Sequence, residues 1–173
     1  MRKKVFWIGV VFALLCAAGW FVYRSLHIPC IGNICPIRHV GPANLYPDSR
    51  LTPGDVFSSA TVEEVCERGY TKRVRHVPRS KKEHVFANYG IPYPQPEGAY
   101  EVDHFIPLEL GGSNDVKNLW LEPANPHPGF HEKDIVENYL HHEVCTGHKT
   151  LHDAQEEIRT DWYRVYLQIK NKS

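Results

Sequence analysis

Four polar residues within a span of 29 positions have the types and spacing of a hydrolytic site. Asp103 and His104 are adjacent, Asn118 lies fourteen residues after the histidine, and His131 lies thirteen residues after the asparagine. Hydrolysis of a phosphodiester needs a group that takes a proton from water and a cation that holds the charge developing on the phosphate. A histidine that titrates near neutrality suits the first role, and a carboxylate with an imidazole suits cation binding. The four residues therefore have the composition of a metal-dependent hydrolytic site.

The sequence around Asp103 and His104 predicts a hairpin with a long loop. Residues 99–106 favour an extended strand, residues 111–115 favour a turn-rich loop, and residues 118–121 favour a second strand. Adjacent residues of a strand point to opposite faces, so Asp103 and His104 converge on one phosphate only if the strand ends or bulges there.

A helix is expected after the hairpin, over residues 131–144. His131, Ile135 and Tyr139 recur at i, i+4 and i+8, so we expect the histidine to face inward. A second helical stripe runs from Leu151 toward the C-terminus and is most simply explained by core packing.

Two short helices are predicted upstream of the hairpin by capping boxes. Thr61 and Ser80 are each followed three residues later by glutamate. Gly69 and Gly90 are placed to end the two helices.

The stretch from Asp103 to Leu119 resembles the HNH endonuclease family. It reads Asp-His-Phe-Ile-Pro-Leu-Glu-Leu-Gly-Gly-Ser-Asn-Asp-Val-Lys-Asn-Leu, and the family motif runs Asp-His, Gly-Gly, Asn-Leu and then a helix residue. From about residue 50 to 165 the chain is also similar to secreted bacterial HNH-like proteins. The resemblance implies an α+β fold whose core is a ββα-metal unit, a hairpin plus a helix, with additional flanking helices.

The resemblance also implies roles for the polar residues. His104 is then the general base, Asn118 belongs to the catalytic apparatus by bracing the loop or orienting His104, and one divalent ion binds to Asp103 and His131. We expect Mg²⁺, with Mn²⁺ or Zn²⁺ as alternatives. His127 is an alternative ligand, but the place of His131 at the helix start favours His131. Many family members brace the motif with a four-cysteine zinc site, and no Cys-x-x-Cys pairs flank it here.

A basic segment is the candidate for substrate binding. Between Arg68 and Lys82 the chain has seven basic residues and no acidic one. Phosphates can lie against such a segment without sequence readout. We expect Arg75 above all, with Arg73 and Lys81, to contact nucleic acid; the alternative is a solvated charged face.

Cysteine usage points to an oxidising compartment. An even number of cysteines lies outside the apolar N-terminal run, and they are Cys30, Cys35, Cys66 and Cys145. Three pairings are possible, and we favour Cys30 with Cys35 and Cys66 with Cys145. The alternative for the first pair is a small zinc site formed by His27, Cys30, Cys35 and His39.

The N-terminus predicts export. Three basic residues precede an uncharged run from Val5 to Tyr23, which as a helix would be about 28 Å long and could span a bilayer. It is either an uncleaved signal anchor or a cleaved signal peptide. We therefore divide the chain into an N-terminal segment (1–26), a Pro-rich tether and entry segment (27–56) and a nuclease domain (57–173), which lies outside the cytoplasm, anchored in a membrane or secreted.

Amino-acid composition and charge exclude some classes of protein. The chain has 173 residues, 42% of them hydrophobic and 23% charged, which fits one globular domain and excludes wholesale disorder or a multi-span membrane protein. The 20 basic and 20 acidic residues balance, so nucleic-acid binding requires a local basic patch. The sequence thus predicts a metal-dependent endonuclease of low sequence specificity, acting on DNA in preference to RNA. The alternatives are a catalytically silent binding domain of the same fold and a structural module that binds metal through its histidines.

Overall fold

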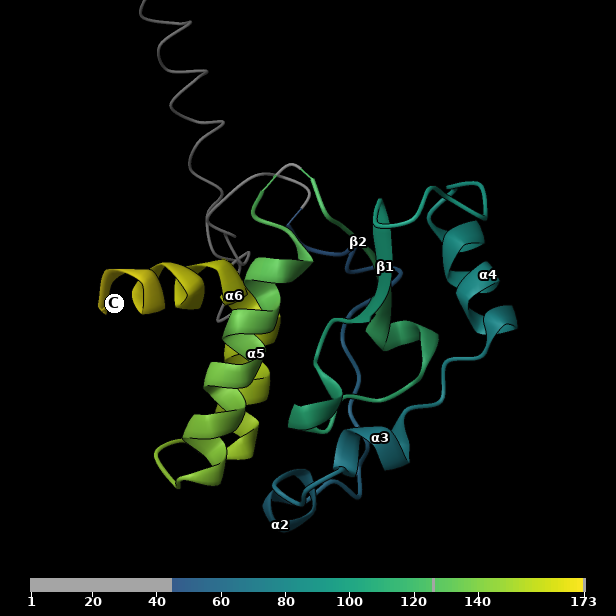
Figure 1. Ribbon diagram of the computed structural model, residues 1–173. Helices are drawn as coiled ribbons and strands as arrows, with labels where there is room; N and C mark the ends of the chain where they lie inside the picture. The colour runs from purple at the N-terminus through teal and green to yellow at the C-terminus, as the bar shows by residue number, and fades with distance from the viewer. Residues whose placement is uncertain (1–44, 126, 173) are drawn as a thin grey trace, which may run out of the picture. The chain divides into compact units, whose positions relative to one another are not determined.

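The computed structural model describes residues 45–125 and 127–172 (Figure 1). The N-terminal segment, the Cys30–Cys35 pairing and the alternative zinc site lie outside the described residues. In the part that is described, no helix is both long enough and apolar enough to cross a membrane.

The described residues form a mixed α+β fold, which confirms the predicted class. Helices, short 3-10 turns and two strands follow one another in the order α2 (Val62–Val65), α3 (Tyr70–Val74), α4 (Arg79–Asn88), β1 (Tyr100–His104), η1 (Leu108–Leu110), η2 (Val116–Asn118), β2 (Leu119–Pro123), α5 (Phe130–Cys145) and α6 (Leu151–Lys172).

The predicted hairpin is present as an antiparallel pair of β1 and β2. Its register runs from Tyr100 opposite Pro123 to His104 opposite Leu119. β1 ends at His104. The long loop between the strands then carries the chain through η1 and η2.

Helices lie on both sides of this hairpin. In Figure 1, α4 lies on one side of β1 and β2, whereas α5 and α6 lie on the other. On the α4 side, Val85 and Phe86 pack in one buried cluster with Leu119 and Leu121 of β2. The hairpin is therefore covered on both faces, which explains why a two-stranded sheet can be stable here.

A second, larger cluster of buried hydrophobic residues lies between α5 and α6. Its buried members on these two helices are Val136, Leu140, Val144, Ala154, Ile158, Trp162 and Val165. The predicted Cys66–Cys145 disulfide is present, and it ties the residue after α2 to the last residue of α5. The bridge and the terminal helices therefore brace the hairpin unit in the absence of flanking Cys-x-x-Cys pairs.

Residues 45–56 of the entry segment are irregular but packed into the domain. Leu45 is buried, and its carbonyl accepts a hydrogen bond of 2.9 Å from Trp162 Nε1. Thr52 is also buried, and its hydroxyl donates to the carbonyl of Leu119 at 2.9 Å. These long-range bonds hold the segment along the hairpin.

The prediction that His131 faces inward is wrong. His131 is exposed and Ile135 is 44% exposed, whereas Lys133 and Val136 are buried. The buried face of α5 begins at Phe130. It is therefore shifted by one residue from the face that was expected to begin at His131.

The prediction of a helix N-cap at Ser80 is also wrong, whereas the capping box predicted at Thr61 is confirmed. α4 begins at Arg79 with Pro78 as its N-cap residue, because the amides of Lys81 and Lys82 both donate to the Pro78 carbonyl. The helix therefore starts two residues earlier than a serine cap would place it.

Candidate active site

Asn118 fixes the loop that follows β1. Its side chain is fully buried; Oδ1 accepts from the amide of Ile106 at 2.9 Å, and Nδ2 donates to the carbonyls of Ile106 at 2.8 Å and Ser113 at 3.0 Å. The same Oδ1 accepts from the amide of Asp55 at 3.3 Å. Each of these bonds goes to backbone, so the geometry favours the bracing role over direct orientation of the His104 ring.

Gly112 lets the loop close on itself. A Cβ atom at this position would lie 1.8 Å from the carbonyl oxygen of Ile106 and 2.9 Å from Asn118 Nδ2. Any side chain would therefore displace the backbone that Asn118 holds, which gives a physical reason for the second glycine of the Gly-Gly pair.

Asp103 and His104 point to opposite faces of the hairpin, as strand alternation requires. In the register of the hairpin, Asp103 lies opposite Trp120, and its side chain contacts Lys133 of α5. His104 lies opposite Leu119, whose side chain packs against α4. Both are the last residues of β1. They can approach one substrate only at the end of the strand.

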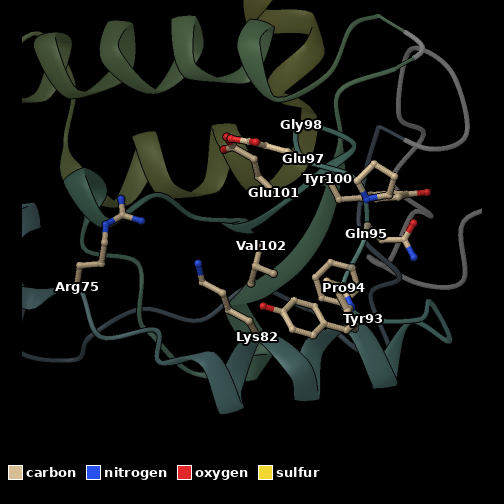
Figure 2. Close-up of a pocket in the computed structure, with 12 residues that line it drawn as sticks. Arg75, Lys82, Tyr93, Pro94, Gln95, Glu97, Gly98, Tyr100, Glu101 and Val102 are labelled. Atoms are coloured by element: carbon tan, nitrogen blue, oxygen red, sulfur yellow. The ribbon is translucent and has the colours of Figure 1, made fainter.

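The α4 side of the hairpin carries a cleft of about 460 Å³ between α4, β1 and the loop that joins them. Arg75 and Lys82 line it, and Figure 2 shows both side chains there. Of the other predicted phosphate contacts, Arg73 pairs with Glu67 at 2.7 Å, and Lys81 Nζ donates to the carbonyl of Asn114 at 2.7 Å. Of the three, Arg75 lines this cleft, Arg73 lines a different cavity beside Tyr70, and Lys81 supports the loop.

His104 is held in one tautomer by Asn114, a residue that the sequence analysis did not identify. Asn114 Oδ1 accepts from the amide of His76 at 3.0 Å, and its Nδ2 donates to the carbonyl of Val74 at 2.8 Å. These two backbone partners define which end of the amide is oxygen. His104 Nε2, 3.2 Å from that oxygen, must therefore carry the proton.

The other ring nitrogen of His104 is consequently an unprotonated lone pair. Nδ1 is buried and has no hydrogen-bond partner among the described residues. Burial lowers the pKa of His104 to about 4, and the positive charges of Arg75 and Lys133 act in the same direction. The imidazole is therefore neutral near pH 7, but its pKa lies below the near-neutral value expected from the sequence, so it is a weaker base than expected.

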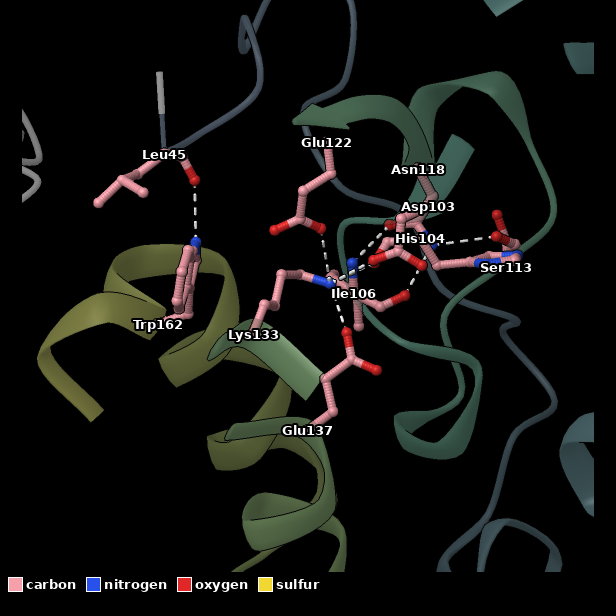
Figure 3. A network of polar contacts seen from close by, with 10 residues as sticks. All are labelled: Leu45, Asp103, His104, Ile106, Ser113, Asn118, Glu122, Lys133, Glu137 and Trp162. Atoms are coloured by element: carbon pink, nitrogen blue, oxygen red, sulfur yellow. Dashed lines mark hydrogen bonds and ion pairs between the residues drawn. The ribbon is translucent and has the colours of Figure 1, made fainter. Parts of the chain in front are cut away.

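Lys133 occupies the centre of a buried charge cluster on the other face (Figure 3). Its Nζ donates to Asp103 Oδ2 at 2.6 Å, to the carbonyl of His104 at 3.0 Å and to the carboxylate of Glu137. Glu122 Oε2 lies 3.7 Å away. One fully buried ammonium thus links α5 to both residues at the end of β1.

The carboxyl groups around Lys133 differ in the direction of their pKa shifts. Burial opposes charge on both Lys133 and Asp103, but their mutual attraction raises the pKa of Lys133 and lowers that of Asp103. Burial raises the pKa of Glu122 well above its usual value and that of Glu137 to about 8. Lys133 and Asp103 therefore form the ion pair of the cluster.

The predicted metal ligands, Asp103 and His131, lie among acidic side chains. Burial raises the pKa of Glu101 and of Asp134, the negative charge of Asp103 raises both further, and His131 acts on both in the opposite sense. Asp103 and His131 thus share neighbours across β1 and α5. Among the described residues, however, neither belongs to a group of three ligand residues close enough to share one metal ion, and Asp103 gives one of its oxygens to Lys133. The alternative ligand, His127, pairs with Glu132 at 3.2 Å.

A second cluster of ligand types surrounds the disulfide. Cys66, His141 and Cys145 bring their ligand atoms within 4.8 Å of one another. Both sulfurs are joined in the Cys66–Cys145 bridge, and His141 Nε2 donates to the carbonyl of Val65 at 3.0 Å. A disulfide sulfur is not a thiolate, so this group does not bind metal in the oxidised protein.

Lys133 could have been identified from the sequence. It falls between Phe130 and Val136, at the three-residue spacing of the buried face of α5. A lysine within such an apolar stripe indicates a buried, paired ammonium. Asn114 offered no comparable signal, because its partners lie 10 to 40 residues away.

Comparison of the chain with family models, with curated proteins and with solved structures found no match.

Proposed function

We propose that this protein is a metal-dependent endonuclease in which the hairpin and α5 form an HNH-type ββα-metal unit. The observation that carries the proposal is the fixed tautomer of His104, which leaves Nδ1 as an unprotonated lone pair at the end of β1. A general base requires a neutral imidazole with one nitrogen free and the other held by a hydrogen bond. Asn114 meets the second requirement.

The side chains around His104 then have distinct tasks. Nδ1 of His104 would take the proton from the attacking water, and because Nδ1 is buried, this step requires the end of β1 to open to water and substrate. Lys133 positions the carboxylate of Asp103 and the His104 backbone together, while Asn118 keeps the following loop in place. Asp103 and His131 would hold one divalent ion, which when bound supplies positive charge to the phosphate.

Nucleic acid is the substrate class that the charges support, and DNA is our proposed substrate. Arg75 is exposed, lines the cleft on the face of His104 and is flanked by Val74 and His76, which both bond Asn114. Contacts from such side chains go to phosphates and carry little sequence preference. The Cys66–Cys145 disulfide supports a location outside the cytoplasm, with the membrane reached through residues 1–26.

A catalytically silent binding domain is the second candidate. The close contact between Lys133 Nζ and Asp103 Oδ2 favours it, because an internal ammonium already neutralises the carboxylate that metal binding would need. Such a domain would bind its partner without turnover.

Nicking of supercoiled plasmid separates the two candidates. The full-length oxidised chain, in a mild detergent, is incubated with Mg²⁺, Mn²⁺, Zn²⁺ or EDTA. His104→Ala is compared with His152→Ala, which removes an exposed histidine of α6. We expect nicking that requires the ion, is lost in His104→Ala and is retained in His152→Ala.

Two results would contradict the proposal. Nicking that persists at the wild-type rate in His104→Ala would remove His104 as the base. Absence of nicking with every ion, from protein whose circular dichroism shows a folded state, would leave the binding domain as the function.

A further inference from the structure

The cleft on the α4 side of the hairpin has a distribution of charge and aromatic surface that the basic segment alone does not explain. Figure 2 shows Arg75 and Lys82 toward the lower left of the view, Glu97 and Glu101 toward the top and Tyr93 toward the lower right. Cations, carboxylates and an aromatic ring thus line different parts of one cleft. A single bound cation or anion would contact only the side chains of opposite charge and would leave the aromatic ring without a role.

Tyr93 is fixed in position while part of its surface stays open. Its ring packs edge-on against Phe86 at 5.0 Å between centroids, and the guanidinium of Arg79 lies 5.8 Å from its centroid. Tyr93 nevertheless remains 38% exposed. An aromatic ring that is held in place and still exposed is a platform on which a flat group can stack.

The cationic part of the cleft is attached directly to the His104 side of the site. Arg75 lies between Val74 and His76, and both of these neighbours bond the Asn114 side chain that holds His104. Val102 and Glu101 of β1 also line the cleft. A phosphate bound at Arg75 would therefore lie beside the end of β1.

We propose that this cleft binds one nucleotide of a single-stranded nucleic acid, with a phosphate at Arg75 and Lys82 and the base stacked on Tyr93. The volume of about 460 Å³ lies within the roughly 300–1,000 Å³ of sites that enclose small ligands. The carboxylates of Glu97 and Glu101 repel phosphate, so they direct the backbone toward the cationic part.

Single strands are preferred over duplexes because of the stacking surface. In a duplex both faces of each base are already stacked on neighbours, so only an unpaired base can place a face on Tyr93. The inference rests on the proposed nuclease function for the identity of its substrate, but binding can be measured without turnover.

Fluorescence anisotropy with a labelled ten-nucleotide thymidine strand, in EDTA, tests the cleft directly. The full-length oxidised chain should bind this strand more tightly than a duplex of the same length. Tyr93→Ala should weaken single-strand binding about tenfold, whereas Tyr93→Phe should retain it because the ring remains. Circular dichroism of both variants checks that each remains folded.

The charge contact has its own matched pair of variants. Lys82→Ala removes a phosphate contact and should reduce the slope of log K against log salt by about 0.7, the value for one contact to a single strand. Lys170→Ala removes another exposed lysine, on α6, and should leave the slope unchanged. Equal slopes for the two variants would overturn the assignment of phosphate to Lys82.

The possible failures are distinguishable. If plasmid is nicked but Tyr93→Ala binds the strand as tightly as wild type, the cleft assignment is wrong and the nuclease stands. If no ion supports nicking but strand binding depends on Tyr93 and Lys82, the nuclease is wrong and the cleft assignment stands. If the folded wild type binds no strand, the cleft assignment is overturned whatever happens to plasmid.

Discussion

Lys133 Nζ, on α5, lies 2.6 Å from Asp103 Oδ2, at the end of β1. The two residues are 30 positions apart, and the lysine side chain is completely buried. The same Nζ donates to the carbonyl of His104. This one ammonium therefore connects the helix to the two strand residues on which the proposed chemistry depends.

Removing this ammonium should strongly destabilise the fold. Lys133→Met leaves the half-buried carboxylate of Asp103 without its cation and removes a donor to Glu137, which we expect to cost about 3 kcal/mol of unfolding free energy. Urea unfolding in EDTA measures the loss.

A surface lysine provides the control for that measurement. Lys149 pairs with Glu157 at 2.7 Å while its side chain is 26% exposed. Lys149→Met should therefore cost about 1 kcal/mol or less. Similar losses for the two variants would mean that the cluster around Lys133 is not a structural unit.

The imidazole of His104 should remain neutral down to about pH 4. Burial holds its folded pKa below the ordinary value of 6.5, so the unfolded chain takes up the proton first as the pH falls. His104 should thus lower the stability progressively between pH 6.5 and pH 4, by about 3 kcal/mol in total. Above pH 6.5 its contribution should be constant.

NMR titration of the histidine side chains in EDTA checks this pKa, with His104→Gln identifying the resonance. The unfolding free energy of wild type minus that of His104→Gln should rise with pH across the same interval. A His104 resonance that titrates at 6.5 or above would contradict the buried, neutral imidazole.

The tautomer of His104 should depend on Asn114. Asn114→Ala removes the acceptor for Nε2–H, so ¹⁵N shifts of the ring should move from a pure Nε2–H form toward a mixture of the two tautomers. Plasmid nicking should fall about 100-fold, because the free lone pair is no longer fixed at Nδ1.

Asn114→Asp keeps an oxygen acceptor and is the matched variant. It should preserve the Nε2–H tautomer while losing the bond from Nδ2 to the Val74 carbonyl. If Asn114→Ala left the ¹⁵N shifts at their wild-type values, another group would have to hold the ring.

Alanine at position 112 should not be tolerated. The added Cβ would lie 1.8 Å from the Ile106 carbonyl oxygen, so the loop held by Asn118 must move. We expect Gly112→Ala to lose more than about 4 kcal/mol in chemical denaturation. Gly147→Ala, at φ +77° with open space around it, should lose only about 1–2 kcal/mol; equal losses would show that the steric contact is relieved elsewhere.

The Cys66–Cys145 bridge should contribute substantially to stability. It joins residues 79 positions apart, and loop-closure entropy assigns it about 4 kcal/mol. The double variant with serine at both positions tests this bridge without reducing other cysteines. Unchanged urea unfolding in that variant would show that α2 and α5 are held together by packing alone.

Local patterns in the sequence were sufficient to predict the elements of the candidate site. Strand-favouring and turn residues predicted the hairpin, although its first strand, Tyr100–His104, is shorter than the expected 99–106, and helical spacing predicted α5 and α6. These features depend on residues a few positions apart, so they can be recognised without knowing the fold. The α+β class followed from the resemblance to the HNH family, and the Cys66–Cys145 pairing from the closeness of Cys30 and Cys35 in the sequence, which left these two cysteines to pair.

Only the tertiary structure decided which side chains meet. The spacing of α5 was helical, but the packing of the helix against the hairpin and α6 turned Lys133 inward and His131 outward. Asn114 meets His104 because residues 74–76 lie beside the loop, through contacts between residues 38 and 40 positions apart. Periodicity specifies an element, whereas the phase of its buried face and the partners of its polar groups depend on the surfaces that pack against it.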